Sequence, residues 1–212
     1  MELVFWAGVN YIIYQISRVR LVYYLEYMVI ALYIVFVKYE WIPFAKRALY
    51  DLHMMVFPVV FVGWIGFNRI YNQSNDWMAK INDILTNRLA LGYQALTQYD
   101  PTLFGQYIKM GTIKVEGGKY YFYIDSGFLY SFMAYGLVFT IAVLVMYSMI
   151  SRYAAKENQR VLLVWLWAVL IFSLVNNTWL DVGFNPILMA FPILLSYGSI
   201  RDENAVAMLL KN

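Results

Sequence analysis

Long apolar stretches constrain this chain more than any other feature of its sequence. A helix rises about 1.5 Å per residue, so about 20 mostly apolar residues cross the hydrocarbon core of a bilayer. The clearest such stretch runs from Gly127 to Ile150. Shorter or interrupted stretches cover Leu3–Ile16, Leu21–Val37, Met54–Tyr71, Val161–Val175 and Phe184–Tyr197. The pattern predicts an all-α integral membrane protein with about six transmembrane helices.

Composition agrees with this class and excludes several kinds of chemistry. Hydrophobic residues make up 62% of the 212 residues and charged residues 14%, whereas soluble domains average about 25% charged residues. The absence of cysteine excludes disulfides, thiol catalysis and thiolate-bound metals. A net charge of +3 is too small to indicate nucleic-acid binding. His53 is the one histidine, so we expect it at a membrane interface and predict no metal site and no cofactor.

The longest polar segment, residues 72–126, separates two of the apolar stretches. Leucines within "NDILTNRLALGYQAL" predict a short amphipathic helix against the membrane surface. The Gly-Gly pair in "KVEGGKYYFYID" predicts a tight turn and a small hairpin. We therefore interpret residues 1–212 as a single membrane domain in which 72–126 form one long loop carrying short helices or a hairpin.

Basic residues in the short connections indicate the orientation. Residues 151–160 contain Arg152, Lys156 and Arg160, whereas "NNTWLDVG" contains no basic residue. Because basic residues favour the cytoplasmic side, we expect the 151–160 connection inside and the 72–126 loop outside. Arg18 and Arg20 then also lie outside, against the usual bias. They are either ordinary interfacial arginines that extend towards the headgroups or a clamp for an anion such as phosphate.

Two acidic residues lie at or within predicted spans. Glu26 interrupts one of them, where an ionised carboxylate is costly, and we favour a paired or interfacial position for it. Asp125 directly precedes the stretch that begins at Gly127. It fits a helix N-cap, and it also fits a carboxylate at the outer membrane surface that acts as a general base. These two interpretations are compatible.

Several segments, taken in order, resemble the C-terminal half of the Wzy-like polymerases of O-antigen, capsule and exopolysaccharide, which are related to the O-antigen ligases. They are a Ser-Arg turn after the first helix, "NDILTNRL" followed by "LFG", "YIDSGFLYSFMAYG" and a late "FNP". The resemblance covers nearly the whole chain, although no single motif is specific. It implies a multi-pass protein of the bacterial cytoplasmic membrane.

The resemblance also implies a reaction. Such enzymes transfer a glycan from an undecaprenyl-diphosphate-linked oligosaccharide to a lipid-linked acceptor, without a nucleotide sugar or cofactor. Cations would neutralise charge on the diphosphate leaving group, and Asp125 would be the general base. The implied cations and further substrate contacts are Arg18, Arg20, Arg88, Gly105, Asn177 and Asn185. Chain-length regulators and flippases are the implied protein partners, beside the lipid bilayer.

Two departures from the family pattern leave an alternative open. Family members are usually much longer, with more helices than this chain contains. Many relatives carry an acidic residue in the late outer loop, where this chain has Asn176 and Asn177. The alternative is therefore a truncated, non-catalytic membrane component of a polysaccharide assembly or export complex.

Overall fold

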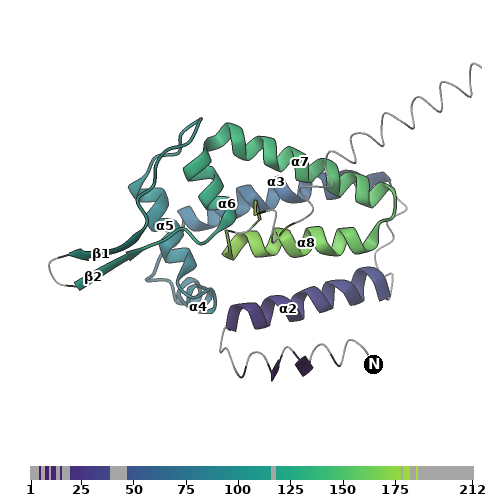
Figure 1. Ribbon diagram of the computed structural model, residues 1–212, viewed down its shortest axis with the longest axis horizontal. Helices are drawn as coiled ribbons and strands as arrows, with labels where there is room; N and C mark the ends of the chain where they lie inside the picture. Colours follow the sequence, from purple (N-terminus) through teal and green to yellow (C-terminus); the bar gives the residue numbers. More distant parts are fainter. Residues whose placement is uncertain are drawn as a thin grey trace, which may run out of the picture.

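The computed structural model describes residues 20–38, 47–115 and 118–177, together with isolated positions near both ends such as 179–181 and 185. Among the elements that the structure describes, α2 (Arg20–Tyr33), which continues into the π-helical turn η1 (Ile34–Lys38), and α3 (Arg47–Arg69) precede the polar segment. A second group of helices follows it, and these are α6 (Gly127–Tyr130), the π-helical turn η2 (Ser131–Tyr135), α7 (Gly136–Lys156) and α8 (Arg160–Val175). The long helices lie alongside one another, with α3 against α7 and α2 against α8 (Figure 1).

Among the described residues, two helical stretches are long and apolar enough to cross a bilayer, namely Asp51–Arg69 and Gly127–Lys156. Two further helices, Tyr24–Tyr33 and Arg160–Val175, are apolar but shorter. The prediction of a mostly helical chain with helices of membrane-spanning character is confirmed at this level. Six spans are not shown, and the expected stretches 3–16 and 184–197 lie largely or wholly outside the described residues.

Stacked aromatic side chains hold the bundle together at its centre. The rings of Phe57 on α3 and Tyr147 on α7 stack with centroids 4.8 Å apart. The Trp179 ring also stacks on Tyr147, with centroids 5.5 Å apart, and meets the Phe128 ring edge to face at a centroid distance of 4.8 Å. Each ring buries a large apolar surface, so this cluster joins α3, α6, α7 and the segment after α8.

The polar segment folds into small elements at one end of the bundle (Figure 1). These are α4 (Asp76–Ile84), α5 (Arg88–Gln98), β1 (Gly111–Val115) and β2 (Gly118–Phe122). The strands pair antiparallel, so the expected short helices and hairpin are present. Apolar side chains connect this part to the long helices in a second buried cluster of Ala95, Ile108, Phe122, Ile124, Leu129 and Met133. The segment is therefore packed onto the bundle.

The turn between α4 and α5 has an unusual backbone. Thr86 and Asn87 both adopt left-handed conformations, with φ of 53° and 66°. The Asn87 amide donates to the Asn82 carbonyl at 2.8 Å, which closes a Schellman-type helix end. A β-branched residue is rare in this region of backbone space, so Thr86 carries strain. The turn sets the direction in which Arg88 leaves the start of α5.

A close contact between two glycines attaches the "LFGQ" segment to the start of α7. Gly105 and Gly136 have φ of 92° and 87°, conformations that L-residues rarely adopt. A Cβ atom on Gly136 would lie 2.2 Å from the Gly105 nitrogen, and one on Gly105 would lie 2.3 Å from the Ala134 carbonyl oxygen. The two backbones can approach this closely only because neither residue carries a side chain.

We predict that Gly136→Ala destabilises the protein by about 2 kcal/mol or more, because it combines left-handed strain with a backbone clash. An unfolding titration in mixed micelles measures this change. Gly66→Ala is the matched control, since a Cβ there meets nothing within 4 Å, and it should be neutral or slightly stabilising. Equal effects of the two substitutions would contradict the proposed role of the glycine contact.

Candidate functional site

Arg88 and Asp125, which the sequence singled out separately, meet at the junction of the polar segment and the bundle. The Arg88 Nε lies 3.6 Å from the Asp125 Oδ2. Their side chains are 19% and 36% exposed, respectively, so the pair is partly shielded and still open to solvent. Arg88 is the first residue of α5, and Asp125 lies between β2 and α6.

Local hydrogen bonds hold the Arg88 side chain in place. Its Nη1 donates to the Leu85 carbonyl at 3.3 Å and also to the Thr86 hydroxyl. The strained turn therefore supplies two acceptors for the guanidinium. Its Nε atom is buried and has no hydrogen-bond partner among the described residues. The 3.6 Å between this Nε and the Asp125 carboxylate is an ion-pair distance and is too long for a hydrogen bond. Arg88 thus retains capacity to donate to an additional anionic group.

Asp125 is not the cap of the helix that follows it, so this part of the sequence prediction is wrong. Ser126 is the N-cap, and its hydroxyl accepts a bond from the Leu129 amide at 3.4 Å. The same hydroxyl accepts from the Trp64 indole at 2.9 Å and donates to the Ser173 carbonyl at 3.2 Å. These tertiary bonds select Ser126 as the cap and leave the Asp125 carboxylate to face Arg88.

The Ser131 hydroxyl is a second buried polar group that holds the start of α6 in place. The Trp179 indole donates to the Ser131 hydroxyl at 2.9 Å, and that hydroxyl donates to the Gly127 carbonyl at 2.8 Å. A Cβ on Gly127 would lie 2.6 Å from the Trp179 ring, so only glycine fits there. The sequence reading missed Trp64, Ser126 and Trp179 as positioning residues, because their partners are distant along the chain.

Asn185 and Gly105, which the resemblance assigns to substrate binding, make contacts within the fold. Asn185 is 2% exposed, and its Nδ2 donates to the Trp179 carbonyl at 2.7 Å and to the Tyr147 hydroxyl. Gly105 is accounted for by its backbone approach to α7. Asn177 is exposed just beyond α8. None of the contacts described joins these three residues to Arg88 and Asp125, and their binding roles stay predictions.

The other residues discussed from the sequence have different outcomes. Arg18 lies outside the described residues, and so does the side chain of Arg20, whose backbone begins α2. Glu26 is partly buried on α2. His53 is 4% exposed and packs edge to face against Trp167 of α8, with centroids 6.3 Å apart, and its expected place at a membrane interface stays a prediction. Packing of α3 against α8 therefore decides its environment.

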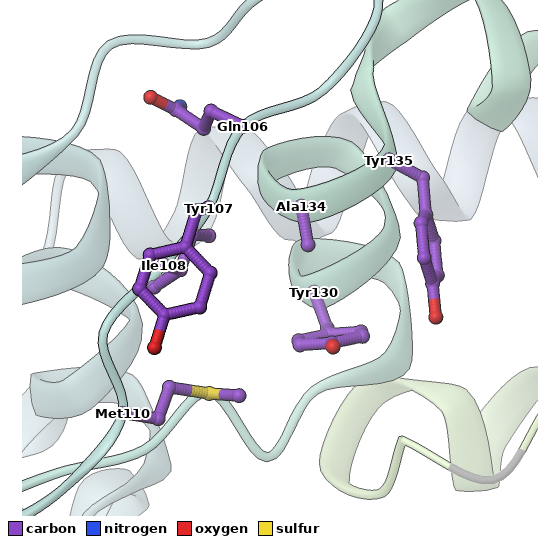
Figure 2. Close-up of a pocket in the computed structure, with 7 residues that line it drawn as sticks. All are labelled: Gln106, Tyr107, Ile108, Met110, Tyr130, Ala134 and Tyr135. Carbon is purple, nitrogen blue, oxygen red and sulfur yellow. The ribbon is translucent and has the colours of Figure 1, made fainter.

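A pocket of about 400 Å³ opens between the segment that follows α5 and the α6–η2 helix (Figure 2). Tyr107 and Met110 lie on one side of it, and Tyr130 and Ala134 of the α6–η2 helix lie on the other. The full lining is Gln106, Tyr107, Ile108, Met110, Tyr130, Ala134 and Tyr135. Its volume falls in the usual range of small-molecule sites, roughly 300–1,000 Å³. The lining combines aromatic faces with hydroxyl and amide groups.

Within the part of the chain that the structure describes, no group of three or more His, Cys, Asp or Glu side chains could hold a metal ion. The charged groups that the structure brings together at the junction are the Arg88 guanidinium and the Asp125 carboxylate.

Comparisons with known proteins found no match: no protein-family model, no curated protein and no solved structure matches this chain.

We predict that Arg88→Ala lowers the free energy of unfolding by about 1–3 kcal/mol, because it removes two hydrogen bonds and an ion pair from a mostly buried side chain. The matched control is Arg152→Ala, whose ion pair with Asp51 spans 3.4 Å between side chains that are 53% and 58% exposed. Such exposed pairs contribute little, so this control should change stability by less than about 0.5 kcal/mol. A similar loss in both variants, measured by unfolding in mixed micelles, would refute the distinction.

Proposed function

We propose that the chain is a glycosyltransferase of polysaccharide repeat-unit polymerisation, acting on an undecaprenyl-diphosphate-linked donor and a lipid-linked acceptor. The observation that supports this most is the Arg88–Asp125 pair, with 3.6 Å between Nε and Oδ2. Such a transfer uses a cation to stabilise the leaving diphosphate and a carboxylate to accept the proton of the acceptor hydroxyl, and the pair supplies one of each.

In the proposed mechanism, Arg88 binds the diphosphate of the donor. A guanidinium presents several fixed donors that match phosphate oxygens and never loses its charge. Its buried Nε already lacks a hydrogen-bond partner within the described chain. As the sugar–phosphate bond breaks, negative charge grows on the leaving diphosphate, and Arg88 stabilises that charge in the transition state.

Asp125 is the proposed general base. In the structure its carboxylate faces Arg88. An incoming diphosphate competes with this carboxylate for the guanidinium, so donor binding frees Asp125 to accept the proton of the acceptor hydroxyl. The proton moves from the hydroxyl to the Asp125 carboxylate as the hydroxyl oxygen bonds to the donor sugar. Donor binding and base activation are then coupled through one ion pair.

The tyrosine-lined pocket is suited to the sugar of the acceptor. Tyr130 and Tyr135 meet edge to face with centroids 5.5 Å apart, and Tyr107 is 87% exposed opposite them. Phenol rings present apolar faces for stacking and hydroxyls for hydrogen bonds, as a sugar ring requires. Tyr130 closes the short helix α6 that begins two residues after Asp125, so the pocket and the carboxylate are close neighbours along the chain.

We expect Arg88→Ala and Asp125→Asn each to abolish long polysaccharide when supplied to a strain lacking the gene, leaving single repeat units. Gel analysis of surface polysaccharide length is the measurement, with membrane abundance of each variant checked by immunoblot. Arg152→Ala is the control and should restore long chains, because it removes an arginine ion pair that lies elsewhere in the bundle. Long chains from Asp125→Asn would remove Asp125 from the mechanism.

A double variant with the two charges exchanged distinguishes a catalytic role of the Arg88–Asp125 pair from a purely structural one. Arg88→Asp combined with Asp125→Arg preserves an ion pair but exchanges the cation and the base. We expect the swapped protein to be at least as abundant as Arg88→Ala, because it regains an ion pair, and still to fail to make long chains. Restoration of long chains by the swap would favour the alternative of a non-catalytic component whose ion pair serves only the fold.

A further inference from the structure

A short non-helical segment, Thr102–Gln106, lies along the first turn of α7. The amides of Leu137 and Val138 donate to the carbonyls of Thr102 and Leu103, at 3.0 and 3.1 Å. The first amides of a helix have no partner within the helix itself, so this segment satisfies two of them. The bonds fix the segment at the level of residues 137 and 138.

The side chains of this segment face outwards although they are apolar. Leu103 is 58% exposed and Phe104 is 84% exposed. Exposure of the Phe104 ring to water to this extent costs free energy. Exposed apolar side chains on the following turns of α7 add to the apolar surface. The outward residues of α7 recur at helical spacing along one face, at Val138, Ile141, Val145 and Met149.

The depth of Thr102–Gln106 in the bilayer follows from the position of α7, to which the segment is bonded. Gly127–Lys156 is a stretch of membrane-spanning character, and Arg152 and Lys156 mark its polar end. Within α7, residues 137 and 138 lie about 22 Å from Arg152 along the helix axis, whereas the opposite edge of a hydrocarbon core lies about 30 Å from that arginine. Residues 137 and 138 then lie about 8 Å inside that edge, at 1.5 Å per residue.

We propose that Leu103 and Phe104 insert into the acyl region of the bilayer as a non-helical anchor for the polar segment. Irregular backbone is tolerated at such depth only where protein covers it and its polar groups have partners. The Gly105 backbone packs directly against residues 134–136. Here the two carbonyls are bonded to α7, the Gln106 amide donates to Ala134 at 3.1 Å, and its side chain donates to the Asp100 carbonyl at 2.6 Å. This inference rests on the apolar span and not on the proposed transferase activity.

The partner is lipid, because the exposed side chains continue the outward face of a span. A docked protein would have to cover that same face within the bilayer. The anchor would hold the tyrosine-lined pocket, which begins at Gln106, at the level of the headgroups. A substrate whose polar part is carried on a lipid would meet the pocket there.

The absence of cysteine from the chain allows a direct test. Phe104→Cys is labelled with the environment-sensitive fluorophore NBD in the full-length protein, reconstituted into phosphatidylcholine–phosphatidylglycerol vesicles. We expect blue-shifted emission, at least twofold quenching by lipids with a nitroxide on the acyl chain, and little quenching by aqueous iodide. Val145→Cys on the outward face of α7 is the positive control.

Lys109→Cys is the matched negative control, since Lys109 is exposed in the same connection but carries a polar side chain. Its label should be quenched by iodide and not by nitroxide lipids. Iodide quenching of the label at 104 to the level seen at 109 would overturn the proposal. Protection from both quenchers would also overturn it, and would indicate a protein contact. Leu103→Cys repeats the test if Phe104→Cys fails to fold, with the same outcomes expected.

Discussion

The hydrogen bond from the Trp64 indole to the Ser126 hydroxyl is the interaction on which the candidate site depends. It joins α3 to the start of α6 across 62 residues of sequence, at 2.9 Å and within the buried interior. The hydroxyl also bonds to α8 through the Ser173 carbonyl. Because a buried polar group must be satisfied, this one serine determines where α6 begins. Asp125, one residue earlier, is thereby directed at Arg88.

Two close backbone contacts place the polar segment against this framework. Gly105 approaches Gly136 at the start of α7, and Gly92 of α5 approaches α3 so closely that a Cβ would lie 1.9 Å from the Asn68 Oδ1. The strained turn at Thr86 then orients Arg88. The site therefore rests on packed helices and a constrained turn, which is the arrangement that holds a charged pair in one geometry. A membrane anchor at Phe104 would add a contact with lipid to these protein contacts.

Sequence reasoning recognised features that depend on neighbouring residues. The apolar stretches at 54–71 and 127–150 correspond to α3 and to α6, η2 and α7, and the predicted hairpin corresponds to the antiparallel strands β1 and β2. Arg88 and Asp125 were each identified as candidates, but nothing in the sequence indicated their contact. The N-cap was assigned to Asp125 because the local capping rule accepts Asp and Ser equally. The contact of His53 with Trp167 of α8 could not be predicted from its position near a helix end, because the two residues are far apart in the chain.

By itself, the sequence determined that the chain is helical and apolar, that thiol chemistry is excluded and which ionisable residues lie at the ends of apolar stretches. These properties follow from composition and from periodicity within a single helix. Only the tertiary structure decided which residue caps α6, that Asn185 is bound within the core by Tyr147 and Trp179, and that Arg88 meets Asp125. The physical reason is that these pairings join segments far apart in the chain, and packing and the satisfaction of buried polar groups select them.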